Sequence, residues 1–117
     1  MTAEPGLTAV KSPFEATTST PGALVDQMIV RQDRAGHIIQ EFSVQLEILI
    51  NGRWRVAMRF DSAHNRPHRH IFYPNGVKYR EFMAADDNNE AFTQAQAILK
   101  KSFREIHERY KIVLERM

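Results

Sequence analysis

The chain has 117 residues, of which 43% are apolar and 26% charged, and it contains no cysteine. This length allows one hydrophobic core and excludes a doubly wound nucleotide-binding fold or a barrel enzyme. No apolar run approaches the roughly 20 residues of a membrane-spanning helix. The absence of cysteine excludes disulfides, thiolate metal ligands and a cysteine nucleophile. Because no signal-peptide pattern opens the chain, we expect a cytoplasmic protein without a membrane partner.

The net charge of +2 conceals an uneven distribution along the chain. Residues 53–80 carry seven arginine and lysine residues against Asp61 alone, a net charge of +6. The segments before and after them are each slightly acidic. The basic character therefore lies in one segment, which is a candidate contact surface for an acidic partner.

Residues 1–23 are rich in proline, glycine, threonine and serine and show no helical or strand periodicity. They predict a disordered N-terminal tail, followed by a single domain at residues 24–117. A first strand at residues 24–31 leads into a turn at Asp33–Gly36. Residues 38–50 then alternate between apolar and polar side chains, as do residues 53–61 after Asn51-Gly52, which predicts a β-hairpin.

Matching the two faces of this hairpin predicts its register. A two-residue turn at Asn51-Gly52 would place Ile48 opposite Arg55 and mix the apolar face with the basic one. We therefore predict a three-residue loop at residues 50–52, with Gly52 in a left-handed conformation. The expected pairs are Ile48 with Trp54, Leu46 with Val56, Val44 with Met58, and Phe42 with Phe60. Trp54 then lies in the core, and the opposite face is polar and largely basic.

The rest of the chain predicts two further strands and a helix. Residues 61–69 form a polar loop in which Pro67 disfavours helix, and strands follow at residues 70–73 and 77–83. Asp86–Asn89 offers helix caps, and apolar residues at helical spacing predict one helix of about 27 residues to Met117. The expected fold is α+β, an antiparallel meander of about four strands packed on one long C-terminal helix.

Three of the five histidines, His64, His68 and His70, lie within seven residues of one another, just after Asp61. In a strand His68 and His70 point to the same face, an arrangement that can hold zinc. Arg66 and Arg69 oppose a cation at this place, so we predict neither a metal nor another cofactor. His37 and His107 lie apart from the cluster, and we interpret them as incidental.

The same residues suit metal-free cleavage of RNA. Imidazoles that titrate near neutral pH can act as general base and general acid, and cations stabilise the charge on the reacting phosphate. The candidate catalytic residues are His64, His68, His70 and Asp61. The candidate phosphate-binding residues are Arg55, Arg59, Arg66, Arg69 and Lys78.

Two other interpretations explain the cluster without catalysis. A basic segment with interleaved aromatic residues suits binding of RNA or of an acidic protein surface. In a purely structural interpretation, the histidines and Asp61 hydrogen-bond to the backbone and hold an irregular loop. The sequence leaves open whether the chain catalyses a reaction.

The segment from Gly52 to His64, with Pro67-His68-Arg69-His70 and Pro74-Asn75-Gly76 after it, resembles a family of small prokaryotic domains of unknown function. That family shows the pattern W-x-x-V-x-R-[YF]-D-x-A-H-x-x-x-H-R. The spacing of Arg59, Asp61, His64, His68 and His70 is also similar to that of TumE-type toxins. The second resemblance implies an RNA-directed toxin with a DNA-binding antitoxin as its partner. The alternative is a non-enzymatic interaction module, such as a subunit of a larger assembly.

Overall fold

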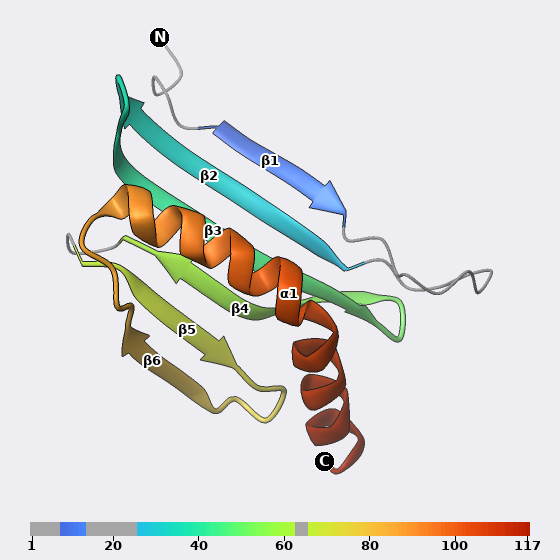
Figure 1. Cartoon of the computed structure of the whole chain (residues 1–117). Coiled ribbons are helices and arrows are strands. Elements are labelled where there is room, and N and C mark those ends of the chain that lie inside the picture. Colours follow the sequence, from blue (N-terminus) through green and yellow to red (C-terminus); the bar gives the residue numbers. More distant parts are fainter. Residues whose placement is uncertain (1–7, 14–25, 63–65) are drawn as a thin grey trace, which may run out of the picture.

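Figure 1 shows a computed structural model of the chain, in which residues 8–13, 26–62 and 66–117 are described. This part of the chain forms a six-stranded antiparallel sheet in the order β1-β2-β3-β4-β5-β6, with a long helix on one face. The elements are β1 (Thr8–Pro13), β2 (Gln27–Ala35), β3 (Ile38–Ile50), β4 (Arg53–Asp61), β5 (His68–Phe72), β6 (Lys78–Phe82) and α1 (Asn88–Glu115). The predicted α+β meander is confirmed, with six strands in place of about four.

Strand β1 corrects part of the predicted disordered tail. Its backbone pairs with β2 from Thr8 opposite Gln32 to Pro13 opposite Gln27. The prediction followed the proline and threonine content of residues 1–23, and it overlooked that β2 offers a free backbone edge. A short segment with β-branched Thr8 and Val10 suits such an edge, and Pro13 stands at its end, where proline is tolerated. The other residues of the predicted tail lie outside the described ranges.

The turn between β3 and β4 has two residues, so the predicted three-residue loop is wrong. Asn51 has a φ of 53° and Gly52 a φ of 75°, the pair of left-handed residues that a type I′ turn requires. This turn matches the natural twist of the two strands, and it places Ile48 opposite Arg55. The preference of Asn-Gly for this turn prevails over the matching of side-chain faces near the loop.

A bulge on β4 then restores the match between the apolar faces. Val56 pairs with Glu47 and Met58 with Leu46, so Ala57 is an extra residue on the β4 side. Beyond the bulge, apolar residues of the two strands oppose each other. Between the bulge and the loop, the side chains of β4 point to the opposite face from the one that the alternating pattern predicted. Trp54 therefore lies outside the core, with 48% of its surface exposed. The prediction that Trp54 is a core residue is therefore wrong.

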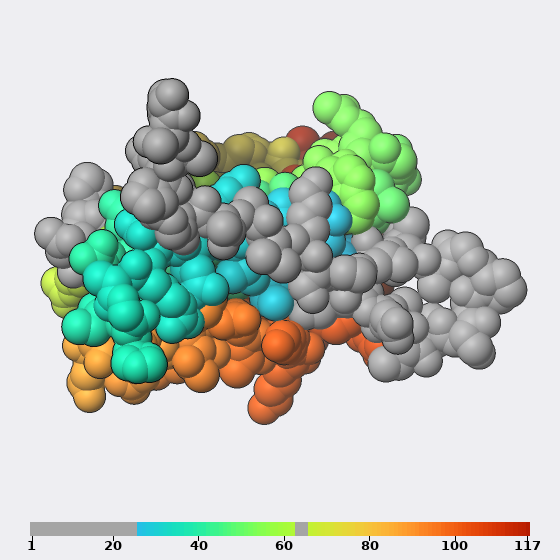
Figure 2. All heavy atoms as spheres, turned by 90° about the horizontal axis from the view of Figure 1, so that it is seen from above, coloured from blue at the N-terminus to red at the C-terminus, as the bar shows by residue number. Residues whose placement is uncertain are grey.

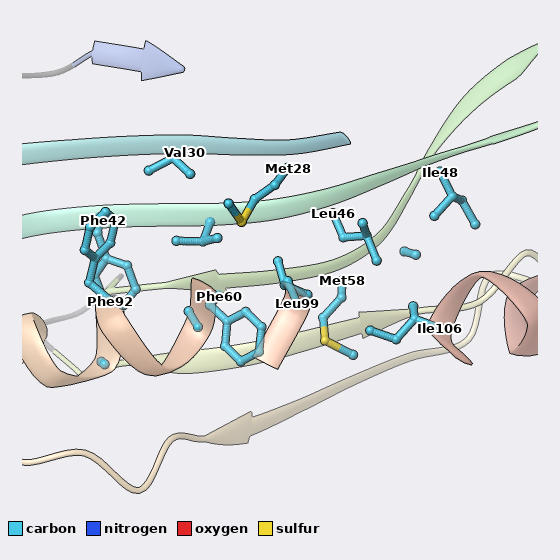
Figure 3. Packing of buried hydrophobic residues seen from close by; sticks show 14 of the residues in the cluster. Met28, Val30, Phe42, Leu46, Ile48, Met58, Phe60, Phe92, Leu99 and Ile106 are labelled. Carbon is cyan, nitrogen blue, oxygen red and sulfur yellow. The ribbon is translucent and has the colours of Figure 1, made fainter. Parts of the chain in front are cut away.

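One side of α1 and one face of the sheet form the hydrophobic core. In β3, Val44, Leu46 and Ile48 are completely buried, as the alternating pattern predicted. They belong to one cluster with apolar residues of β4 and of α1, and Figure 3 shows Leu46 beside Met58 of β4 and Leu99 of α1. The predicted helix is confirmed: Asp87 caps its first turn by accepting a hydrogen bond of 2.8 Å from the backbone N–H of Glu90.

The sheet has a helix face, on which α1 packs, and an open face on the other side. Figure 2 shows α1 as a layer on one side of strands β2 and β3. In β4, Met58 and Phe60 are buried on the helix face. Since side chains alternate along a strand, Arg59 and Asp61 point to the open face. None of the described helices is long and apolar enough to cross a membrane.

Candidate functional site

Two histidines, one aspartate and two arginines meet on the open face of β4, β5 and β6. Asp61 of β4 lies opposite His68 of β5, and Arg59 lies opposite His70. On the other side of β5, Arg80 of β6 lies opposite His70. Directly opposite residues of antiparallel strands share a face and lie about 5 Å apart. The register thus brings together residues that are up to 21 positions apart in the sequence.

The shortest polar contact in this group joins Asp61 and His70. Nε2 of His70 lies 3.0 Å from Oδ2 of Asp61, and both side chains are largely buried. This is the distance of an ion pair, and Nε2 of His70 makes no hydrogen bond to the described residues. The same oxygen of Asp61 accepts a hydrogen bond of 3.2 Å from Nε of Arg59. Asp61 therefore lies between a histidine and an arginine and can orient both.

His68 has a different environment from His70. Only 5% of its surface is exposed, and its ring packs 4.7 Å from the ring of Phe82. Burial lowers the pKa of His68 below its ordinary value, and the positive charge of Arg80 lowers it further. Asp61 opposes this shift, while His70, whose ring centroid is 6.1 Å away, adds to it. His68 is thus a buried imidazole that favours its neutral form.

Aromatic rings hold the polar groups of the open face in place. The ring of His70 stacks on Phe72 with an interplanar angle of 10°, and the guanidinium of Arg59 lies 5.5 Å from the centre of the Phe72 ring. Arg66 lies 3.5 Å from the centre of the Phe82 ring. Such cation–π contacts position arginines without neutralising their charge. The face therefore keeps an excess of positive charge around His70.

The structure separates the predicted phosphate-binding residues into two groups. Arg59, Arg66 and Lys78 lie on the open face, where Lys78 is opposite Phe72. Arg55 is opposite the buried Ile48, so it lies on the helix face. Arg69, opposite Phe60 and paired with Glu81, also lies on that face. The predicted catalytic residue His64 lies outside the described residues.

Arg80 is the open-face residue that the sequence analysis missed. It belongs to the same basic segment, and its distance of ten residues from His70 gave no reason to place the two together. The signal that could have found it is the turn at residues 74–76: a tight hairpin there pairs β5 with β6 and sets Arg80 opposite His70.

Comparison with known proteins assigns the chain to a family. A family model with the description Domain of unknown function (DUF7718) matches residues 23–115. The chain belongs to this family. The DUF7718 match includes β2 to β6 and the whole of α1, and with them the open-face cluster. No curated protein and no solved structure matches the chain. The expected resemblance to a family of uncharacterised domains is confirmed.

Outside the cluster, the DUF7718 domain contains a second histidine–aspartate pair. Nδ1 of His107, on α1, lies 2.9 Å from Oδ2 of Asp26, which precedes β2. The Asp26 carboxylate also accepts a hydrogen bond of 3.3 Å from the backbone N–H of Leu49. Burial raises the pKa of Asp26, against the opposing effect of His107. This pair joins the helix to two strands, so His107 is not incidental.

We predict that lowering the pH from about 7.5 to about 5 destabilises the DUF7718 domain through His68. The folded state lowers the pKa of His68, so the unfolded chain binds this proton more readily. The corresponding stabilisation is complete above the ordinary pKa near 6.5 and is lost as the pH falls through the folded-state value. Urea unfolding midpoints should therefore depend less on pH in His68→Phe, which keeps an aromatic ring against Phe82 and does not titrate.

Asp26 does not confound this comparison. Its raised pKa acts in the opposite direction, since that contribution to stability is lost as the pH rises. Asp26 is present in both proteins, so the difference between them isolates His68. Equal slopes of the unfolding midpoint against pH in the two proteins would contradict the prediction.

Proposed function

We propose that the open face binds RNA and cleaves it beside a 2′-hydroxyl group, in the manner of an RNA-directed toxin of a toxin–antitoxin pair. The observation that carries this proposal is the contact of 3.0 Å between His70 and Asp61, with Arg59 on the same carboxylate. A carboxylate behind an imidazole, with a cation beside it, is an arrangement suited to moving a proton near a phosphate. A protein of this kind acts in the cytoplasm.

Charge and shape support RNA as the ligand. On the part of the open face formed by β4, β5 and β6, four cations, Arg59, Arg66, Lys78 and Arg80, accompany a single carboxylate, that of Asp61. Within the described ranges, no helix covers this face, so a single strand can lie across it. Trp54 is exposed, near the turn between β3 and β4, and offers a ring on which a base can stack.

The proposed chemistry uses the two nitrogens of His70 differently. Nε2 is buried beside Asp61, which leaves Nδ1 as the nitrogen that accepts the proton of the 2′-hydroxyl. The 2′-oxygen then attacks phosphorus, and the 5′-oxygen leaves with a proton from solvent or from the imidazolium. Asp61 stabilises the imidazolium, and Arg59 and Arg80 stabilise the negative charge on the phosphate oxygens.

The burial of His68 favours a second candidate function, which is RNA binding without cleavage. A second imidazole would be the natural general acid, but His68 is 5% exposed and disposed to be neutral. In this second function the same cations contact the phosphates, and the histidines and Asp61 hold β4 and β5 together.

Three labelled oligonucleotides of one sequence test the proposal, namely RNA, 2′-O-methyl RNA and DNA. We expect the protein to bind RNA at low salt, to lose much of its affinity at about 0.5 M salt, and to cleave only RNA. The products should end in a 2′,3′-cyclic phosphate. Cleavage of the 2′-O-methyl strand would overturn the mechanism. Binding without cleavage would establish the second function, and no binding at low salt would overturn both.

A further inference from the structure

The exposed edge of β6 shows features of a binding site for another protein chain. β6 is the last strand of the sheet and pairs with β5 on one side. Among the described residues no strand pairs with its other side, and all five of its residues are exposed. Its pairing with β5 runs without a bulge, and β6 contains no proline, so the free backbone edge is regular.

The two faces of this edge differ in chemistry. Lys78 and Arg80 point to the open face, whereas Tyr79 and Glu81 point to the helix face, where Glu81 pairs with Arg69. A strand added beside β6 would place every second side chain next to Lys78 and Arg80. Acidic side chains at those positions would neutralise two cations that have no carboxylate opposite them in the pairing with β5.

The helix face beside β6 offers space for the other side chains of an added strand. α1 packs against β3 and β4, and Figure 1 shows β5 and β6 to one side of it. A groove of about 380 Å³ lies between α1 and this part of the sheet. Phe60, Met83 and Ile98 give it apolar walls, and the paired side chains of Arg69 and Glu81 also line it. Apolar side chains that alternate with the acidic ones would lie on the groove side of the sheet.

A second copy of this chain is a poor occupant of the edge. Two copies of β6 paired antiparallel are related by a two-fold axis normal to the sheet, so residues of the same face oppose each other. When the two-fold axis passes through Tyr79, Lys78 of one copy lies opposite Arg80 of the other. When the axis passes through Arg80, the two copies of Arg80 lie opposite each other. When it passes through Glu81, the two copies of Glu81 do. Each central register thus brings like charges together, which destabilises a sheet.

We propose that β6 is the docking edge for an extended segment of a partner protein in which acidic and apolar residues alternate. The segment adds a seventh strand to the sheet, with backbone hydrogen bonds supplying affinity and the alternating side chains supplying specificity. The docking edge shares Lys78 and Arg80 with the proposed RNA surface, but its occupation by a peptide can be measured without RNA, so failure of one proposal leaves the other standing.

Titration of the full-length protein with a synthetic peptide of about ten alternating Glu and Val residues tests this inference. We expect binding by calorimetry, with slower amide hydrogen exchange in β6. The double variant Lys78→Glu/Arg80→Glu should weaken binding at least about tenfold. The double variant Lys100→Glu/Lys101→Glu, on α1, makes the same change in net charge and should bind as the unchanged protein does.

Two comparison peptides and one measurement on the protein alone complete the test. A peptide that alternates Lys and Val, and one with the Glu residues in one block and the Val residues in another, should bind at least about tenfold more weakly. Equal binding of all three peptides, protection of amides away from β6, or no binding of the first peptide would overturn the inference. A dimer in sedimentation of the protein alone that the Lys78→Glu/Arg80→Glu variant loses would also overturn it, in favour of self-association.

Discussion

Replacement of His70 by alanine is expected to lower the rate of RNA cleavage by about 10²-fold to 10⁴-fold, the range that a general base contributes. His70 is the histidine of the open face that contacts the Asp61 carboxylate directly. Its removal leaves Arg59 and Arg80 able to contact phosphate, so the affinity for RNA should change little. The comparison of single-turnover cleavage rates with equilibrium binding of 2′-O-methyl RNA measures the two effects separately.

The neighbours of His70 should affect cleavage in a graded way. Asp61→Asn keeps the size of the side chain but removes the charge that stabilises the imidazolium, and we expect a loss of about 10-fold to 100-fold, the range found for residues that orient the histidine ligands of metal sites. Arg59→Gln removes a cation from the phosphate, so it should weaken binding as well as cleavage.

His37→Ala is the matched control for His70→Ala. His37 lies in the exposed turn between β2 and β3, and its backbone carbonyl accepts a hydrogen bond of 2.7 Å from Asn89. The alanine variant keeps that carbonyl and should cleave RNA at the unchanged rate. In cells, induced expression of the protein with His37→Ala should still arrest growth, whereas His70→Ala should not. Full cleavage and growth arrest by a folded His70→Ala protein would contradict the proposed role.

The spacing of apolar residues was sufficient to predict β3 and the helix, because each buries one side, at every second residue in β3 and at helical spacing from Ala91 to Tyr110 in α1. The same reasoning found the β3–β4 hairpin but gave it the wrong loop length and register. Face matching assumed an unbroken ladder, whereas the extra residue Ala57 lets an Asn-Gly turn coexist with paired apolar faces further along. A bulge of one residue leaves no mark in the apolar pattern that distinguishes it from a shifted register. This single residue decides that Trp54 is exposed and that Arg55 lies on the helix face.

The sequence predicted most of the residues of the candidate site, but not how their side chains are arranged. Proximity in sequence grouped Asp61, His68 and His70 correctly, because a short connection joins β4 to β5. The pattern could not show that His68 is buried, since that depends on Phe82, which belongs to another strand. Nor could it show the pairing of His107 with Asp26, which lie 81 positions apart and meet only when α1 packs on the sheet.

Replacement of Leu99 by alanine is expected to destabilise the folded state by about 2–5 kcal/mol, the usual cost of such a truncation in a core. Leu99 is completely buried and lies on the side of α1 that faces the sheet, beside Leu46 and Met58 (Figure 3). The substitution removes apolar contacts and leaves a cavity between helix and sheet. Since small domains have a total stability of about 5–15 kcal/mol, the urea unfolding midpoint should fall markedly.

Ile112→Ala is the control for this prediction on the same helix. Ile112 lies in the C-terminal part of α1 with 45% of its surface exposed. Alanine favours helix more than isoleucine does, which offsets part of the lost burial, so we expect a change below about 1 kcal/mol. Similar losses of stability in the two variants would show that α1 does not pack on the sheet through the side that carries Leu99. A large loss in Leu99→Ala alone would establish that α1 packs on the sheet through this side. Because that packing holds α1 over β3 and β4, the groove beside β6 stays open.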